Sequence, residues 1–214
     1  MTERELRVSL EDRDQWVTAV PGRRASVAFP VIDFPTWGLC TAVTRRAGIN
    51  GHNGDRMSHA GDVVLFGGSV EPGESGPDAA LRELCEESNT LGHLFDPEYR
   101  VGDHLGSWVT ESGFIVDGFL VHLPPTFYDV SRPEPREVER IGYLRLDHLF
   151  ATEPALAYHR VDRRDTRLGT EAECYFESPT IDLVEASTGQ PWTLWGAAGY
   201  MASRARERIL RDAS

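Results

Sequence analysis

A stripe of carboxylates stands out in the segment Pro77–Ser88, which is rich in residues that favour a helix. Glu83, Glu86 and Glu87 occupy positions i, i+3 and i+4, so a helix would place all three on one face. Carboxylates this close repel one another unless a cation neutralises them, and oxygen ligands suit Mg²⁺ or Mn²⁺ better than Zn²⁺. The spacing therefore predicts a divalent metal site, with a solvated acidic face as the alternative.

A turn and a helix start must hold these carboxylates in place. The glycine pair at residues 67–68 leads into a turn at residues 70–74 that contains Pro and Gly. Pro77 suits the first turn of a helix, where its missing N–H costs nothing, and Ser75 or Gly76 can cap that helix. We therefore expect a loop followed by a helix whose other side packs on the protein.

The stretch from residue 67 to residue 91 resembles the Nudix hydrolase box. That box runs glycine, five residues, glutamate, seven residues, and then Arg-Glu-aliphatic-x-Glu-Glu-x-Gly-aliphatic. The residues in register with it are Gly68, Glu74, Arg82, Glu83, Leu84, Glu86 and Glu87. Agreement at so many fixed positions makes a chance match negligible. The resemblance implies an α/β Nudix fold, in which a mixed β-sheet lies between helices as an α/β/α sandwich.

The end of the box departs from the pattern at two positions. Asn89 replaces the last glycine and Thr90 the last aliphatic residue. Asn is the next best residue for the left-handed conformation that ends a helix, so we expect the metal ligands to be unaffected. Leu91 is expected to take the packing role one residue late.

The resemblance also implies a role for each box residue. The implied ligands of Mg²⁺ or Mn²⁺ are Gly68, through its carbonyl, and the side chains of Glu83, Glu86 and Glu87. Arg82 would orient a box glutamate through a charge-assisted pair, and Glu74 would hold the loop or Arg82. The general base stays open among Glu83, Glu86 and a loop glutamate.

That loop glutamate is expected after the box. In Nudix hydrolases a Glu-Val pair commonly precedes the last core strand and can bring a carboxylate to the metal, and Glu137-Val138 resembles it. Glu137 therefore joins the candidate catalytic residues, with Glu139 as the second choice. A surface salt bridge is the alternative role for Glu137.

Residues 44–68 resemble the upstream signature of the coenzyme A diphosphatases, a subfamily of Nudix hydrolases. That signature reads Leu-Leu-Thr-x-Arg-Ser/Ala, a spaced Arg, Gly, and then Phe-Pro-Gly-Gly. The matching residues are Thr44, Arg46, Ala47, Gly61, Gly67 and Gly68. The loop at 48–58 is longer than the pattern allows, Arg56 lies one place too far from Gly61, and Leu65-Phe66 stand where Phe-Pro is expected.

The substrate-binding residues implied by this second resemblance are Arg46, Arg56, Gly67, Gly68 and Gly113. Guanidinium groups pair bidentately with phosphate oxygens, which suits Arg46 and Arg56 to a phosphate. Glycine lets the backbone approach a ligand, which is the reason to include Gly113. The alternatives are solvated loop arginines and an ordinary hairpin turn.

The remaining elements follow from local patterns. Strands are predicted at residues 25–32, 38–44, 102–109 and 113–122, a helix after Trp195-Gly196, and a solvated loop at 153–172. Residues 1–24 are predicted to be an N-terminal extension, with a helix over 9–19 packed on the domain, and residues 25–214 the Nudix domain. The Trp-Gly-Ala start of the last helix again resembles the coenzyme A subfamily.

Composition restricts the partners. The chain has 214 residues, a net charge of −12 and a pI near 5.0, which argues against a nucleic acid polymer as partner. The three cysteines form no CxxC pair, so neither a disulfide framework nor a zinc site is indicated. No apolar run is long enough for a membrane span, and the charged N-terminus is unlike a signal peptide. We expect a cytoplasmic protein that binds a small-molecule nucleotide, and a homodimer is kept open.

Three functional hypotheses follow from these patterns. The first is a pyrophosphatase for coenzyme A or acyl-coenzyme A, which the signature before the box supports. The second is a Nudix pyrophosphatase for ADP-ribose, a dinucleotide or an isoprenoid diphosphate, which the departures from that signature favour. The third is a Nudix binding module without catalysis, against which the intact set of box carboxylates argues.

Overall fold

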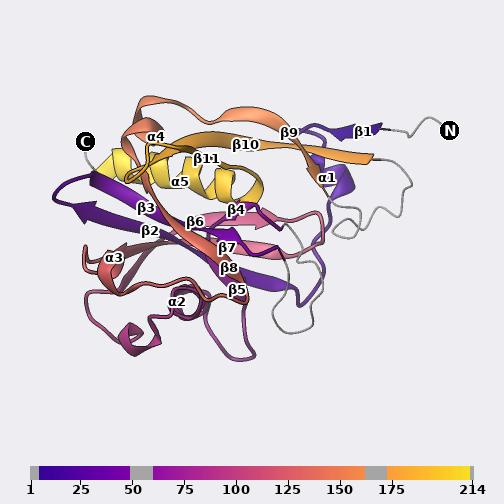
Figure 1. The fold of residues 1–214 in the computed structure, drawn as a ribbon. Helices are drawn as coiled ribbons and strands as arrows, with labels where there is room; N and C mark the ends of the chain where they lie inside the picture. The colour runs from indigo at the N-terminus through magenta and orange to yellow at the C-terminus, as the bar shows by residue number, and fades with distance from the viewer. Residues whose placement is uncertain (1–4, 49–59, 162–172, 213–214) are drawn as a thin grey trace.

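A mixed β-sheet is the centre of the computed structural model, which describes residues 5–48, 60–161 and 173–212 (Figure 1). Its strands are β1 Glu5–Val8, β2 Arg24–Phe34, β3 Gly38–Arg46, β4 Val63–Val64, β5 Phe66–Ser69, β6 Arg100–Val109, β7 Ile115–Leu123, β8 Val138–Arg145, β9 Ala155–Val161, β10 Glu173–Glu185 and β11 Pro191–Leu194. The helices are α1 Arg13–Trp16, α2 Gly76–Glu87, the 3₁₀ turn η1 Leu91–His93, α3 Phe127–Val130, α4 Asp147–Ala151 and α5 Gly196–Asp212.

The strands follow the order β1-β10-β8-β3-β2-β7-β6, with the short strands paired to this path. The central pair β2–β7 is parallel, while β3 pairs antiparallel with both β2 and β8, and β6 pairs antiparallel with β7. The box glycines lie on β5, which runs antiparallel to the start of β2. This pairing fixes the glycine pair at one end of the central strand.

Helices cover both faces of the sheet, with α2 on one side and α5 on the other (Figure 1). Successive strand residues point to opposite faces, and β2 shows this directly. Ala28 and Ile32 join the core under α2, whereas Phe29 and Val31 join the core under α5. A strand buried on both faces must lie in the middle of the sandwich. The predicted α/β fold with a mixed sheet between helices is confirmed.

The helix that carries the carboxylates ends as its sequence suggests. Asn89 has φ 54° and is the one non-glycine residue with positive φ in the described part of the chain. Thr90 is buried and its hydroxyl lies 2.8 Å from that of Ser88, so the aliphatic position of the box is filled by a hydrogen-bonded pair. The expectation for Leu91 is wrong, because 54% of the residue's surface is exposed.

The N-terminal segment is less helical than predicted. In place of a helix over residues 9–19, it forms strand β1 and a single helical turn, α1. The predicted loop at 153–172 is also wrong where it can be compared, because residues 155–161 are strand β9, paired with β10. None of the helices in the described ranges is long and apolar enough to span a membrane.

Candidate functional site

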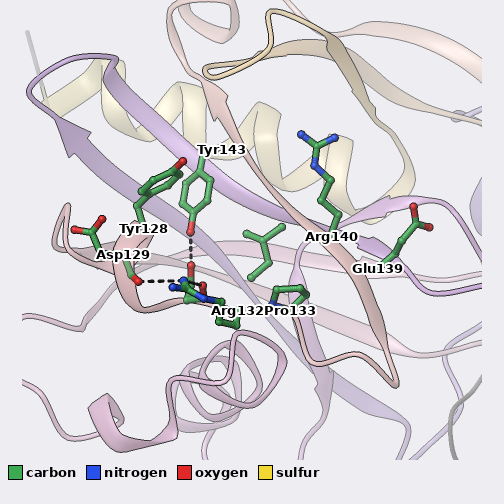
Figure 2. Close-up of a pocket in the computed structure, with 9 residues that line it drawn as sticks. Tyr128, Asp129, Arg132, Pro133, Glu139, Arg140 and Tyr143 are labelled. Carbon is green, nitrogen blue, oxygen red and sulfur yellow. Dashed lines mark hydrogen bonds between the residues drawn. The ribbon is translucent and has the colours of Figure 1, made fainter.

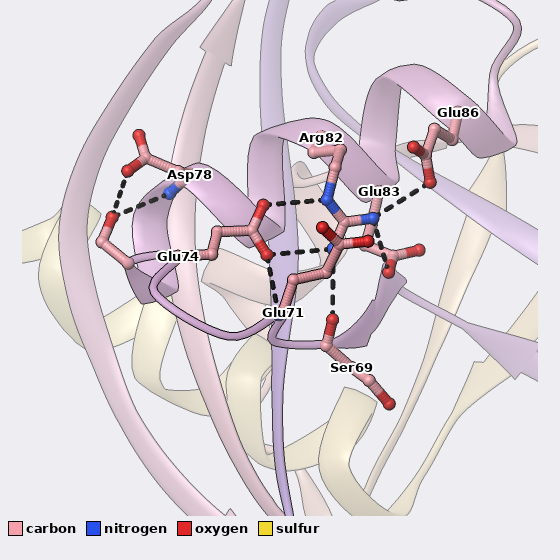
Figure 3. Close-up of polar contacts among 8 residues, drawn as sticks. Ser69, Glu71, Glu74, Asp78, Arg82, Glu83 and Glu86 are labelled. Carbon is pink, nitrogen blue, oxygen red and sulfur yellow. Dashed lines mark hydrogen bonds and ion pairs between the residues drawn. The ribbon is translucent and has the colours of Figure 1, made fainter.

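Arg82 is the hub of the polar contacts around helix α2 (Figure 3). Its Nε and Nη2 atoms donate to the two carboxylate oxygens of Glu74, at 2.8 and 3.1 Å. Its Nη1 atom donates to Glu83 and to Glu86, each at 3.0 Å. Nη2 also donates to the carbonyl of Ser69 at 3.1 Å. One guanidinium therefore joins the loop, the end of strand β5 and two of the metal-ligand candidates.

The loop before α2 is closed by its own side chains. Glu74 accepts a hydrogen bond from the backbone N–H of Glu71 at 3.0 Å, and its bond to Arg82 is the main cause of its lowered pKa. Ser75 caps the helix by accepting from the N–H of Asp78, as the sequence predicts. Together these contacts fix where α2 begins and how it faces β5.

Glu83 packs directly against the glycine pair. A Cβ atom built on Gly68 would lie 2.4 Å from Oε1 of Glu83, closer than any real contact. Glycine at position 68 therefore has a steric reason, because any side chain there would displace the carboxylate. Burial raises the pKa of Glu83, although the bond from Arg82 works in the opposite direction.

Glu87 is the buried member of the set, with 5% of its surface exposed. Burial raises its pKa to about 8, against the influence of the Arg46 charge. The charges of Glu83 and Glu137 raise that pKa further, and a backbone hydrogen bond from Gly67 lowers it. Four predicted residues are therefore close enough to Glu87 to act on its carboxylate.

These oxygens fit a divalent cation. The Oε2 atom of Glu87 is buried and has no hydrogen-bond partner among the described residues, which is costly unless something binds it. Glu83 and Glu86 both accept hydrogen bonds from Arg82. Within residues 5–48, 60–161 and 173–212, no group of three acidic, His or Cys side chains surrounds a common metal position. The donors are carboxylates, which Mg²⁺ and Mn²⁺ prefer.

A cavity of about 470 Å³ opens beside the glycine pair. Arg46, Asp62, Gly67, Gly68 and Ser69 line the end next to the box. The rest of the wall is mostly apolar and includes Trp108, Glu111, Phe114, Val116, Trp195 and Ala198. The cavity thus offers a charged end beside the carboxylates and an aromatic end farther away.

Arg46 connects the carboxylates to this cavity. It lines the cavity, acts on the carboxylate of Glu87, and its buried Nε has no hydrogen-bond partner among the described residues. Its backbone pairs with the neighbouring turn, because the N–H of Gly61 donates to the Arg46 carbonyl at 3.1 Å. A guanidinium whose Nε atom has no partner, at the wall of a cavity, can bind an anion.

The other predicted residues are placed as follows. Glu137 is exposed, and its carbonyl accepts from the N–H of Ala47 at the end of β3, so it lies beside the site. Glu139 lines a different cavity. Gly113 has φ 85° in the turn between β6 and β7, and its neighbours rather than Gly113 itself line the 470 Å³ cavity. Arg56 lies outside the described residues.

A second cavity, of about 440 Å³, lies between α3 and the start of β8 (Figure 2). Tyr128, Arg132, Glu139 and Tyr143 are among its lining residues. The hydroxyl of Tyr143 and that of Ser131 are 2.5 Å apart. None of the box residues lines this cavity, so it does not belong to the carboxylate site.

The aromatic end of the larger cavity was not predicted from the sequence. Trp108 lies in a strand whose alternation is visible, but alternation alone does not show which face meets a ligand. Trp195 directly precedes the last helix, and that position alone does not indicate a cavity wall. Both become candidates because strand β6 and the start of α5 meet at this cavity.

Comparisons with known proteins agree with this arrangement. Residues 23–164, well over half of the chain, match the family model described as NUDIX domain. Solved structures similar to this one include the Nudix hydrolase RenU from M. smegmatis (TM-score 0.50, 15% identity, 94% of this chain and 96% of that chain). Another is a MutT/nudix family protein from Enterococcus faecalis (TM-score 0.53, 13% identity, 90% of this chain and 63% of that chain). At these identities the likeness shows the fold. No curated protein matches the chain.

Proposed function

The chain belongs to the NUDIX domain family, and from this premise we propose that it is a divalent-metal-dependent diphosphatase that cuts coenzyme A or acyl-coenzyme A. Water would add to one phosphorus of the diphosphate and the bridging P–O bond would break. The products would be adenosine 3′,5′-bisphosphate and 4′-phosphopantetheine, or its acylated form. Hydrolysis of a diphosphate linked to a nucleoside is the activity of the family; the choice of coenzyme A is our own proposal.

The position of Arg46 carries the choice of substrate. Arg46 belongs to the stretch that resembles the coenzyme A signature, its side chain lines the 470 Å³ cavity, and its charge acts on the Glu87 carboxylate. Coenzyme A carries a 3′-phosphate that ADP-ribose lacks, and the desolvation of that phosphate needs a cationic partner. Arg46 supplies one such partner inside the described site.

The chain's own residues prepare the hydrolysis. Glu83, Glu86 and Glu87 would hold the cation, and Arg82 would keep the first two in position through its Nη1 atom. When bound, Mg²⁺ or Mn²⁺ offsets the charge of the diphosphate and makes a bound water a better nucleophile. Among the glutamates that pair with Arg82, Glu86 has the most exposed side chain, at 44%. Water can therefore reach it, and Glu86 would accept a proton from that water. Glu137, also exposed and beside the site, is the alternative base.

A substrate panel tests this proposal. Purified protein with Mg²⁺ or Mn²⁺ is given coenzyme A, its 3′-dephospho form, ADP-ribose or a dinucleoside polyphosphate, and the products are separated by chromatography and measured over time. We expect the highest kcat/KM for coenzyme A, with both products identified by mass spectrometry. Much faster turnover of ADP-ribose or of a dinucleotide would overturn the substrate and leave the diphosphatase activity in place.

A further inference from the structure

The segment before residue 23 is attached to the rim of the 470 Å³ cavity. Strand β1 pairs with β10, and the backbone N–H of Leu10 donates to the Glu177 carboxylate at 3.0 Å. The N–H of Val20 donates to the carbonyl of Gly113 at 2.8 Å, in the turn whose neighbouring residues line the cavity. This segment precedes the part of the chain that matches the family model. Its contacts with the rim therefore lie outside the region that the family model describes.

One side chain of the segment reaches the cavity wall itself. Arg13, in the single turn α1, is 5% exposed although it is a long charged residue. Its Nη2 atom binds Oε1 of Glu111 at 2.5 Å, and its guanidinium lies over the ring of Trp108, 4.1 Å from the centroid. Glu111 and Trp108 both line the cavity. Arg13 thus lies behind two adjacent wall residues and contacts both.

These contacts restrain the side chains of Trp108 and Glu111. The ring of Trp108 is held on one side by Arg13 and lies 5.2 Å from the ring of Tyr200 on helix α5. Glu111 is 15% exposed in its side chain, so without Arg13 its charge would be nearly buried and uncompensated. Removal of Arg13 should therefore release both side chains from their present positions.

We propose that Arg13 is a positioning residue for substrate recognition, which fixes Trp108 and Glu111 as the wall that meets the nucleoside end of the substrate. The inference rests on the proposed function, because Arg46 and the glycine pair then take the phosphate end of the same cavity. An apolar aromatic wall fits a base ring, and a carboxylate beside it accepts hydrogen bonds from amino or hydroxyl groups and repels phosphate. The segment before the family domain thereby sets part of the specificity.

Three variants test this role: Arg13→Ala, Arg13→Lys and Arg7→Ala. Arg7 is the matched control, since it lies on β1 of the same segment but is exposed and pairs with Glu5. We expect Arg13→Ala to raise KM for coenzyme A by roughly tenfold while kcat changes little, because truncation of a buried anchor weakens binding. Arg13→Lys should recover much of the loss, since it keeps the charge facing Glu111, and Arg7→Ala should match the wild type.

An equilibrium measurement separates this inference from the proposed function. Binding of α,β-methylene ADP, whose P–C–P linkage resists hydrolysis, is followed by isothermal titration calorimetry with Mg²⁺ present. A loss of affinity of roughly tenfold in Arg13→Ala alone supports the inference even if no compound in the panel is cut. Equal affinity in all proteins, no binding to the wild type, or an equal loss in Arg7→Ala overturns it. If Arg13→Ala fails to fold, Glu111→Gln takes its place in the same measurement: a loss of affinity supports the inference, and a wild-type affinity overturns it.

Discussion

The side chain of Arg82 donates hydrogen bonds to both carboxylate oxygens of Glu74, eight residues earlier in the chain, with N–O distances of 2.8 and 3.1 Å. This two-point contact fixes the plane of the guanidinium and leaves its Nη1 atom directed at Glu83 and Glu86. Glu74 is therefore placed to act, through Arg82, on two of the metal-ligand candidates. We therefore expect the box motif to include a positioning pair as well as metal ligands.

We expect Glu74→Gln to lower kcat by one to two orders of magnitude, because an amide cannot accept both donors of Arg82, whose geometry is then lost. Glu71→Gln is the control, since Glu71 lies in the same loop and contributes its backbone N–H to Glu74. Steady-state kinetics under saturating Mg²⁺ would compare the two variants. Equal rates for both would show that the pair has no part in turnover.

Gly68→Ala should abolish most activity while the fold persists. The added Cβ would meet Glu83 at 2.4 Å, and a carboxylate can move aside more easily than the backbone of β5. We expect a loss of about a hundredfold in kcat, the order seen when one electrostatic stabiliser is removed. Gly92→Ala, where a Cβ meets nothing within 4 Å, is the control. Full activity in Gly68→Ala would contradict the close approach.

The buried thiols should make the protein sensitive to alkali. Burial raises the pKa of Cys40 and that of Cys85 to about 11, from an ordinary value near 9.0. Their contribution to stability is complete below pH 9 and is lost as the pH rises toward 11, because the unfolded chain releases these protons first. Each thiol lowers the free energy of unfolding by about 1.4 kcal/mol per pH unit in that window.

Urea unfolding between pH 8 and pH 11, monitored by circular dichroism, measures this slope. The Cys40→Ala/Cys85→Ala variant should be less stable at pH 8 and should lose less stability than the wild type up to pH 11. Cys174→Ala serves as the control for the loss of a thiol. An identical slope in the double variant and the wild type would refute the assignment.

Arg46→Ala should reduce the preference for coenzyme A over its 3′-dephospho form by about an order of magnitude in kcat/KM, or about 1.4 kcal/mol, because it removes a cationic partner for phosphate. Arg145→Ala is the control, since that exposed arginine pairs with Asp147 at the far end of β8. If the ratio of the two kcat/KM values does not change, Arg46 does not recognise the 3′-phosphate.

Local patterns were enough to predict the box and much of the sheet. Helix α2 starts at Gly76 with a Ser75 cap because Ser, Pro and the glutamate spacing are signals carried by neighbouring residues. The same holds for strands β2, β3, β6 and β7, whose ends lie within about two residues of the predicted ends. Strand β9 was missed because its polar residues, such as His159 and Arg160, resemble those of a loop.

Contacts between distant residues could not be predicted in this way. Arg13 and Glu111 meet across the fold, and nothing in either local stretch signals the other partner. The burial of Glu87 depends on how α2 packs. The spacing of the carboxylates predicted that they share one face of the helix, but it could not predict that one of them is buried. The aromatic wall of the cavity likewise arises where β6 and α5 meet, which only the fold shows.

The central claim is that the box carboxylates hold a cation that the hydrolysis requires. The most direct measurement is turnover of the best panel substrate by dialysed protein, with added Mg²⁺ or with excess EDTA, in the wild type and in Glu87→Gln. We expect activity only with Mg²⁺ in the wild type, and a loss of some hundreds-fold in the variant at unchanged fold, since a buried ligand charge is removed. Full wild-type turnover in EDTA, or turnover of Glu87→Gln within a few-fold of wild type, would contradict the claim.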